Sequence, residues 1–318
     1  MTPEVSVLVV TYKCRDVARA CLASIYETAG DLEPEVVVLD NASGDGTVEL
    51  VRSEFPQAQL VASETNLGFA AGVNRAAEAA QGEYLLLLNP DTVVHEGAIQ
   101  ALLAFARSRP KGGLYGGRTL DPDGTVNPGS CWAAPSLWSL FCFATLLTTA
   151  FRRNALFDPE SIGGWKRDTV REVDIVTGCL MLAPRSLWRE LDGFDTRFFM
   201  YGEDADLSLR AHALGYRPAI TPDAVVTHEI GVSSDADGAK YLFLYRGKAT
   251  LLRKHWHGLR LRAGLALLVA GVGARALLRP RGGYADVWRR RREWLAGYPE
   301  PVKASDPAHV PRGEVGTV

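Results

Sequence analysis

Runs of apolar residues alternate with segments of helical spacing through the first part of the chain. The apolar runs cover 5–12, 35–39, 59–63 and 84–88. A run as continuously apolar as the first is typical of a strand that is buried on both faces of a parallel sheet. Between the first two runs, apolar residues recur at helical spacing over 17–28. This order of strand, helix and strand predicts a right-handed crossover within a parallel sheet.

Further helices and strands are expected along the rest of the chain. The predicted helices cover 47–54, 66–80, 95–108, 184–191, 203–214, 240–257, 259–278 and 284–295, and the predicted strands cover 112–120, 173–182 and 225–228. The pattern weakens over 127–169, which predicts an insertion. The last twenty residues, 299–318, contain four prolines and are expected to form a disordered tail.

The composition indicates a globular protein. Its 318 residues are 47% hydrophobic, which is ample for one large domain with an appendage. The five cysteines form no C-x-x-C pair, so neither a disulfide framework nor a zinc site is predicted, and a reducing cytosol fits best. The first residues lack the features of a signal peptide. No apolar run reaches the ~18 to 20 residues of a spanning helix, and the longest, 137–151 and 263–274, are expected only to lie against a membrane.

The charge is distributed unevenly along the chain. The formal net charge is −2, but 240–294 contains 14 Lys or Arg and only two acidic residues, against 21 and 35 in the rest of the chain. Solvated helical faces would explain such an excess. It also suits docking on an anionic membrane surface, where each basic residue contributes ~1 kcal/mol. Binding to nucleic acid is not expected, because no recognition fold accompanies the charge.

Polar side chains follow the predicted strands at the edge of the sheet where ligands collect. Asp40, Asn66 and Asp91 each stand just beyond a strand end. The first strand is not followed by G-x-G-x-x-G, and the chain has no G-x-x-x-x-G-K-[ST], so a dinucleotide fold and a P-loop enzyme are both disfavoured. Asp40 can accept hydrogen bonds from a base edge or a ribose. It can equally serve as a helix cap or a turn carboxylate.

Asp91 is a candidate ligand for a divalent cation, which takes oxygen ligands and keeps substrate phosphates and waters in its shell. His228, at the end of a later predicted strand, can complete the protein's share of that shell. An imidazole ligand suits Mn²⁺ somewhat better than Mg²⁺. A single histidine at a strand end can also be an ordinary, partly buried residue.

Glu203, Asp204 and Asp206 place three carboxylates within four positions. At a helix start they are favoured by the helix dipole, and Asp206 is expected to pair with Arg210 one turn later. The preceding segment 193–202 is rich in glycine and aromatic residues, and it could form a wall for a ring-shaped substrate. A carboxylate here could take the proton from an attacking hydroxyl.

Together these motifs carry a family resemblance. Five blocks occur in order: V-V-T-Y, V-L-D-N-A-S-G-D-G-T, N-L-G-F-A-A-G-V-N, L-L-N-P-D-T and G-F-D-x-x-F-F-M-Y-G-E-D-A-D-L. Over 5–233 the chain resembles the family 2 glycosyltransferases of the GT-A fold, and most of all the bacterial rhamnosyltransferase and galactofuranosyltransferase-like branch. The resemblance implies an α/β fold in which a Rossmann-like, mainly parallel sheet is flanked by helices.

The resemblance also implies a division of the chain. A catalytic domain would cover 1–238, with a nucleotide-binding half over about 1–120 and an acceptor half over about 121–238. A basic and apolar helical region would follow over 239–298, ahead of the tail. The insertion at 127–169 would face the acceptor.

The reaction implied is an inverting transfer by single displacement. Carried over from the family's motifs, Asp204 would be the base, Glu203 would orient the acceptor or assist Asp204, and Asp91 with His228 would bind Mn²⁺ or Mg²⁺. The residues implied in nucleotide binding are Thr11, Tyr12, Asp40, Asn41, Asn66, Gly68, Asn74 and Asn89. Asn89 replaces the first acid of the family's D-x-D element, so the site has one negative charge fewer.

The expected donor is a nucleoside diphosphate sugar, with dTDP-rhamnose favoured. The expected acceptor is a saccharide or a polyprenyl-linked saccharide in cell-envelope polysaccharide synthesis. Such an enzyme would be cytoplasmic and peripheral on the inner face of the cell membrane, and the sequence leaves a homo-oligomer open. Two alternatives are a tailoring glycosyltransferase acting on a soluble small molecule and a non-catalytic nucleotide-sugar-binding protein.

Overall fold

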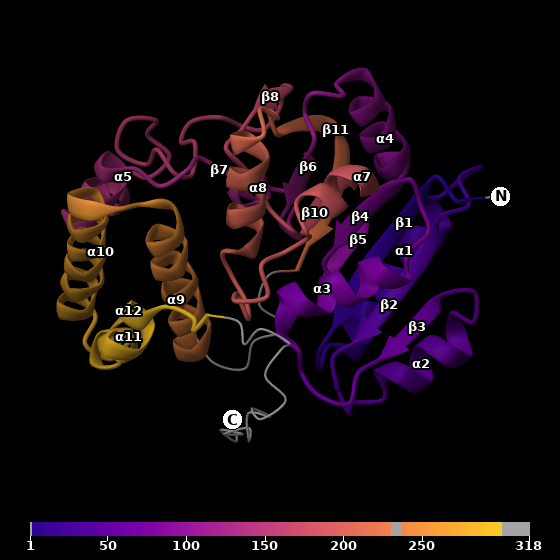
Figure 1. Ribbon diagram of the computed structural model, residues 1–318, viewed down its shortest axis with the longest axis horizontal. Coiled ribbons are helices and arrows are strands. Elements are labelled where there is room, and N and C mark those ends of the chain that lie inside the picture. The colour runs from indigo at the N-terminus through magenta and orange to yellow at the C-terminus, as the bar shows by residue number, and fades with distance from the viewer. Residues whose placement is uncertain (1, 230–236, 301–318) are drawn as a thin grey trace.

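A mixed sheet organises the computed structural model, which describes residues 2–229 and 237–300. Within these residues the sheet has nine strands in the order β3-β2-β1-β4-β10-β6-β11-β5, with β8 beside β11. Helices cover both faces of the sheet, and a group of C-terminal helices stands at one end (Figure 1).

The first four strands form the parallel part of the sheet, as predicted. They are β1 (Val5–Thr11), β2 (Glu35–Asp40), β3 (Gln59–Ala62) and β4 (Tyr84–Leu88), and they are connected by α1 (Arg15–Thr28), α2 (Thr47–Glu54) and α3 (Gly68–Ala79). Successive residues of a strand point to opposite faces. Accordingly Leu8 and Val10 belong to the core shared with α3 and α8, whereas Val7 and Val9 belong to the core shared with α1 and α4.

The second half of the sheet is mostly antiparallel. It contains β5 (Thr92–Val94), α4 (Ala98–Ser108), β6 (Tyr115–Leu120), β8 (Arg171–Glu172), β10 (Leu180–Pro184), α7 (Arg185–Glu190), α8 (Glu203–Ala213) and β11 (Ala219–His228). The predicted single strand over 173–182 is wrong in part, because the chain forms separate short strands there. The strand predicted at 225–228 is the end of the longer β11.

The end of β11 returns toward the end of β4. Its register against β6 shifts between Ile220 and Val225, and its last residues pair with β5, which begins only a short turn after β4. His228 is thereby the register partner of Thr92. This pairing brings the end of a late strand to the Asn89–Asp91 turn.

The insertion is compact and carries short elements of its own. These are a 3₁₀ turn (Pro128–Ser130), β7 (Cys131–Trp132), α5 (Leu137–Ala144) and α6 (Leu147–Ala150), and β7 pairs with β9 (Ile175–Val176). Ser136 and Ser139 form a reciprocal capping box at the start of α5, which explains why this apolar helix begins there.

The predicted C-terminal helices are present. They are α9 (Asp237–His255), α10 (Gly258–Leu278), α11 (Gly283–Arg289) and α12 (Arg291–Ala296), so the third predicted helix is split in two. They share a core with Leu140 of α5, and α9 lies nearest the sheet in Figure 1. The predicted tail from 301 onward lies outside the described residues, and the domain boundaries stay a prediction.

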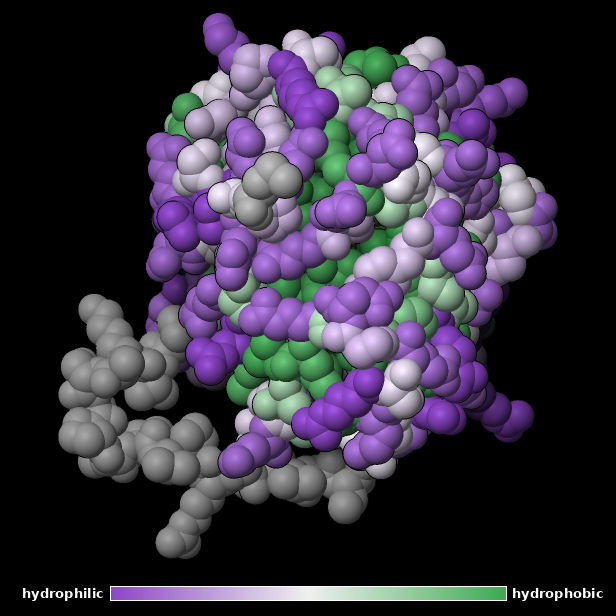
Figure 2. Space-filling view, turned by 90° about the vertical axis from the view of Figure 1, so that its right-hand side faces the viewer, coloured by the Kyte–Doolittle hydropathy of each residue, from purple (hydrophilic) through white to green (hydrophobic). Residues whose placement is uncertain are grey.

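One helix in the described part of the chain, α10, is long and apolar enough to cross a membrane. An 18-residue window in its 21 residues has a mean hydropathy of 1.7, and 33% of that window is buried. The expectation that no segment reaches this length is therefore wrong, since α10 extends beyond the uninterrupted apolar run on which it rested. By contrast, the face on the side of α4 and the N-terminus is largely hydrophilic, with apolar residues in a narrow strip (Figure 2).

Candidate active site

The ends of β1 and β2 are joined through the side chain of Asp40. Thr11 Oγ1 donates to Asp40 Oδ1 at 3.1 Å, and the Ser43 backbone N–H donates to Asp40 Oδ2 at 3.0 Å. Asp40 is therefore a turn carboxylate, one of the two roles that the sequence left open. A carboxylate has about four acceptor sites, so these bonds do not exhaust its capacity.

The loop from Asn66 to Gly68 is tied to the end of β2 by Asn41. Asn41 Nδ2 donates to the Gly68 carbonyl at 2.9 Å, its Oδ1 accepts from the Leu67 N–H at 2.8 Å, and Asn66 Oδ1 accepts from the Gly68 N–H at 2.9 Å. Gly68 has a φ of +80°, and a Cβ there would lie 2.4 Å from the Phe199 carbonyl oxygen. Only glycine fits at this position, where the loop meets the segment 193–202 that precedes Glu203.

Asn74 performs a similar task further along α3. Its Nδ2 donates to the Phe194 carbonyl at 2.8 Å, and its Oδ1 accepts from the Phe194 N–H at 2.9 Å. Asn41 and Asn74, both predicted to bind nucleotide, thus bond backbone groups with both side-chain polar atoms. These bonds hold the two loops in position, and each amide retains a further donor hydrogen and a further acceptor lone pair. Tyr12, just past β1, is 36% exposed and free to form a wall of the site.

Asp91, His228 and Asn89 come together at the end of β4. His228 Nε2 lies 3.0 Å from Asp91 Oδ1 and 3.5 Å from Asn89 Nδ2, although 137 residues separate Asp91 from His228. At 3.0 Å the Asp91 and His228 side chains are hydrogen-bonded to each other. Two ligands at ~2.1 Å from an octahedral ion, at right angles to each other, are also ~3 Å apart, so the pair has the spacing that a divalent cation would need. Among the described residues no group of three or more His, Cys, Asp and Glu could hold a metal. Substrate phosphates and water would have to supply the other ligands.

Glu203, which is buried, and Asp204, which is half-buried, form an acid pair at the start of α8. Asp204 Oδ1 accepts from the Ala205 N–H at 2.7 Å, and its Oδ2 accepts from the Gly178 N–H at 3.3 Å. Burial raises the pKa of Glu203 well above its ordinary value, and the charge of Asp204 raises it further. Burial also raises the pKa of Asp204, against the two N–H groups that lower it. Each carboxyl therefore takes up a proton more readily than an exposed one does.

The Oε2 atom of Glu203 is buried and has no hydrogen-bond partner within the described residues. A buried polar atom without a partner costs ~1 to 3 kcal/mol, so such atoms are retained where a ligand or a role requires them. The protein therefore offers an unused acceptor or donor beside Asp204, where a substrate hydroxyl could bind.

The turn after β4 and the start of α8 are each bonded to one of two consecutive residues, Cys179 and Gly178. Gly178 N–H donates to Asp204, while the carbonyl of Cys179 accepts from the Asn89 N–H at 3.2 Å. A Cβ on Gly178 would lie 3.2 Å from the ring of Phe69, so the Asn66–Gly68 loop closes on the same place. No sequence motif marks 178–179, because these bonds arise from tertiary packing.

Asp206 pairs with Arg210 at 2.8 Å, as predicted, but it also binds two residues of α9. Its Oδ1 lies 2.8 Å from Lys254 Nζ and 2.9 Å from His255 Nε2. Burial alone would raise the pKa of Asp206, but the His255 hydrogen bond and the charges of Arg210 and Lys254 lower it to about 2. The i,i+4 spacing within α8 predicted the pairing with Arg210. Such spacing holds only within one helix, so it could not predict the partners on α9.

The fold and the motifs agree with comparisons to known proteins. The family model described as Glycosyl transferase family 2 matches residues 6–173. The chain belongs to this family. It is 30% identical over 317 residues, covering 93% of this chain and 99% of the relative, to an N-acetylglucosaminyl-diphospho-decaprenol L-rhamnosyltransferase of Mycobacterium tuberculosis. It is 27% identical over 244 residues to the O-antigen biosynthesis protein RfbC of Myxococcus xanthus, covering 74% of this chain and 18% of RfbC.

Solved structures of glycosyltransferases share the fold. The mannosyltransferase PcManGT of Pyrobaculum calidifontis, in complex with GDP-Man and Mn²⁺, superposes with a TM-score of 0.57 at 20% identity, covering 93% of this chain and 84% of that one. S. aureus TarS 1-349 in complex with UDP gives a TM-score of 0.53 at 17% identity, covering 92% and 78%. The predicted GT-A fold with C-terminal helices is confirmed, and the protein is a glycosyltransferase.

Asp206 predicts a specific dependence of stability on pH. The folded protein keeps this carboxylate ionised down to about pH 2, whereas the unfolded chain protonates it near pH ~4. The stabilisation, ~2 to 3 kcal/mol, is therefore complete above pH ~5 and is lost as the pH falls from ~4 to ~2.

Urea unfolding of the wild type and of Asp206→Asn tests this dependence. The difference in unfolding free energy between them should shrink by about half between pH ~7 and pH ~3. The control is Asp286→Asn, which breaks an exposed ion pair with Arg289 and should change little at either pH. A wild-type-to-Asp206→Asn difference that is constant with pH would contradict the assignment.

Proposed function

We propose that this protein is an inverting, metal-dependent rhamnosyltransferase that moves L-rhamnose from dTDP-rhamnose to a polyprenyl-linked saccharide in cell-envelope polysaccharide synthesis. The observation that carries the proposal is the junction at 178–179, where the Asn89 backbone and the Asp204 carboxylate bind neighbouring residues. A single displacement needs a leaving group and a base on opposite sides of one carbon. A cation-binding pair and an acid pair separated by one short backbone segment suit that requirement.

In the proposed reaction an acceptor hydroxyl attacks the anomeric carbon of rhamnose. The new C–O bond forms as the bond to the nucleoside diphosphate breaks, and Asp204 takes the hydroxyl proton. Glu203 Oε2, which has no partner within the described residues, binds the acceptor beside Asp204. Asp91 and His228 would hold Mn²⁺ or Mg²⁺, which neutralises charge on the departing diphosphate. An imidazole among the ligands favours Mn²⁺.

The sugar and the acceptor are proposed from the mycobacterial relative. That protein is an L-rhamnosyltransferase acting on a decaprenol-linked N-acetylglucosamine, and it matches this chain over nearly the whole length of both. The dTDP part of the donor rests on the resemblance to the rhamnosyltransferase branch. A lipid-linked acceptor would place the protein on the cytoplasmic face of the cell membrane.

A set of exposed apolar residues, which we call the docking face, supports the membrane location. It consists of Leu137, Trp138 and Phe141 of α5, Phe151 and Leu156 after α6, and Leu259, Leu277 and Leu278 of α10, all between 40% and 85% exposed. The helices α5 and α10 pack against each other, so these residues belong to one end of the molecule. An exposed apolar surface beside basic residues suits an anionic leaflet.

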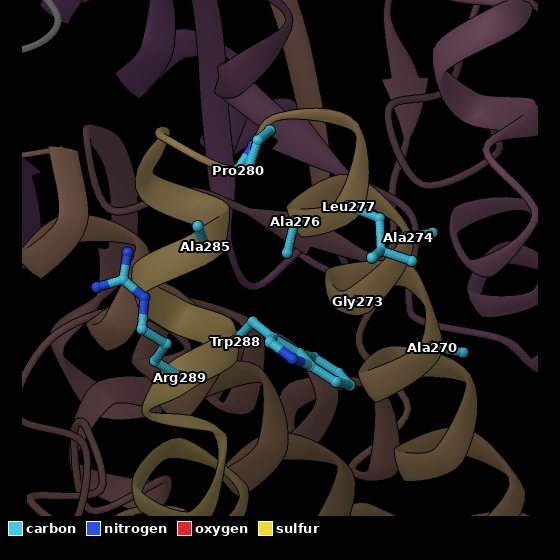
Figure 3. Close-up of a pocket in the computed structure, with 9 residues that line it drawn as sticks. All are labelled: Ala270, Gly273, Ala274, Ala276, Leu277, Pro280, Ala285, Trp288 and Arg289. Atoms are coloured by element: carbon cyan, nitrogen blue, oxygen red, sulfur yellow. The ribbon is translucent and has the colours of Figure 1, made fainter.

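A cavity of about 490 Å³ lies between α10 and α11, away from the strand ends (Figure 3). It is lined by Ala270, Gly273, Ala274, Ala276, Leu277, Pro280, Ala285, Trp288 and Arg289. In Figure 3 the Trp288 indole points toward α10 and Arg289 points away from it. This lining has no carboxylate or side-chain amide to bind a sugar, so the cavity extends the apolar surface at Leu277.

A thermal-shift panel of dTDP, UDP and GDP, with and without Mn²⁺, tests the donor and the metal together. Because a ligand at 100-fold its Kd stabilises the folded state by ~2.7 kcal/mol, dTDP with Mn²⁺ should raise Tm most. Asp91→Asn should remove the Mn²⁺-dependent part, whereas Asp123→Asn in an exposed turn should keep it. A larger rise in Tm with UDP or GDP would contradict dTDP as the nucleotide of the donor. An equal rise in Tm without Mn²⁺ would contradict the proposed metal dependence.

Asp204→Asn tests the proposed base. The amide oxygen can still accept from the Gly178 N–H, so nucleotide binding should persist, while kcat should fall by ~10² to 10⁴ because the proton acceptor is lost. The control is Glu190→Gln on the exposed side of α7. Titration calorimetry measures nucleotide binding, and a coupled assay of the released nucleoside diphosphate measures turnover. A kcat within about tenfold of wild type would remove Asp204 from the role of base.

Co-sedimentation with phosphatidylglycerol vesicles tests the docking face. The wild type should bind at low salt and dissociate as salt rises, because the attraction of basic residues to the leaflet is screened. The double variant Leu277→Gln, Leu278→Gln should bind at least about tenfold less, since burying even one leucine is worth ~1.5 to 3 kcal/mol. The control Leu214→Gln changes an exposed leucine just after α8. Wild-type protein that stays in the supernatant at every salt concentration contradicts the docking face.

A further inference from the structure

Helix α9 packs directly against the segment 199–201, which precedes the acid pair Glu203 and Asp204. A Cβ on Gly247 would lie 1.9 Å from the Tyr201 carbonyl oxygen, so α9 and this segment touch backbone to backbone. Beyond α12, the Tyr298 hydroxyl donates to the Met200 carbonyl at 2.7 Å, and the Tyr298 N–H donates to Thr250 Oγ1 at 2.8 Å. On the other side, the Phe69 N–H donates to the Phe199 carbonyl at 2.7 Å. The segment is thus held between α9 and the loop that opens α3.

Lys254 continues this face of α9. Gly247, Thr250 and Lys254 are spaced by three and four residues, so they lie on one side of the helix. Lys254 Nζ lies 2.6 Å from Asp195 Oδ2 and 2.8 Å from Asp206 Oδ1. Asp195 precedes the acid pair and Asp206 follows it. A single ammonium group therefore joins the two ends of the segment that contains Glu203 and Asp204.

Neither carboxylate depends on Lys254 alone for a partner. Asp206 also binds Arg210 at 2.8 Å and His255 at 2.9 Å. Asp195 Oδ1 accepts from the Arg197 N–H at 2.9 Å, and its Oδ2 lies 3.8 Å from Arg197 Nε. Removing the ammonium would leave both acids paired within the fold. What would be lost is the link between them.

We propose that Lys254 is a positioning residue for the transfer reaction, which sets the spacing of Asp195 and Asp206 and so places Asp204 against Gly178. The residue acts through the acid pair and does not touch substrate. Because α9 shares a core with α10, α11 and α12, the helices of the docking face and the acid segment are parts of one packed unit. The inference rests on the proposed role of Asp204 as the base.

Lys254→Met tests the proposal, with Lys248→Met as a matched control. Lys248 stands on the same helix and pairs with Glu160, and its side chain is 23% exposed against 22% for Lys254. Lys254→Met should lower kcat by about 10- to 100-fold, because misplacing a reacting group by ~1 Å costs up to about 100-fold. The donor KM should change by less than about threefold, since the donor side is untouched. Lys254→Arg should recover most of kcat, and Lys248→Met should stay within about twofold of wild type.

Hydrogen exchange of the 198–202 amides gives a readout that needs no sugar. Exchange there should speed up in Lys254→Met and stay unchanged in Lys248→Met. The proposal is overturned if Lys254→Met keeps kcat within about threefold of Lys248→Met, or if its exchange at 198–202 equals wild type. If exchange rises as expected but the wild type transfers no rhamnose, the proposed function fails, while the ordering of the 198–202 segment by Lys254 stands.

Discussion

The carboxylate of Asp206 is wholly buried, and its ionised state requires cations from two helices. Arg210 comes from its own helix, and Lys254 and His255 come from α9. Breaking a buried ion pair by removing one partner typically costs 3 to ~5 kcal/mol, so α8 and α9 are strongly constrained to stay together. Because Glu203 and Asp204 occupy the first turn of α8, this constraint also determines the position of their carboxyl groups.

The three acids at the start of α8 have opposite environments and hence different tasks. Cations lower the pKa of Asp206 to about 2, while burial raises the pKa values of Glu203 and Asp204. Neighbouring titratable groups whose pKa values are moved apart usually divide structural and chemical roles. Here Asp206 anchors the helix, and the proposed roles in proton transfer and in binding a hydroxyl fall to Asp204 and Glu203. The proposed metal ligand Asp91 follows Asn89, whose backbone N–H binds the Cys179 carbonyl, and Asp204 binds the adjacent Gly178 N–H.

The local signals in the sequence predicted much of the fold. Continuous apolar runs located the parallel strands, helical spacing located the C-terminal helices, and the ordered motifs identified the family. The contacts between distant segments were only partly predictable. His228 was predicted as a partner of Asp91 through family motifs, but the strand register that brings them together depends on the bend of β11. Lys254 and the 178–179 junction carry no local signature, because their roles arise from tertiary packing.

The proposed activity joins a rhamnose donor to a prenyl-linked acceptor in one site. Its most direct measurement is mass spectrometry and NMR of the product formed by the full chain with Mn²⁺, dTDP-rhamnose and N-acetylglucosaminyl diphosphate linked to a short prenyl chain. The product should carry one added deoxyhexose, with the anomeric configuration opposite to that of the donor. Transfer from a different nucleotide sugar in place of dTDP-rhamnose, or a product that retains the donor's configuration, would contradict it.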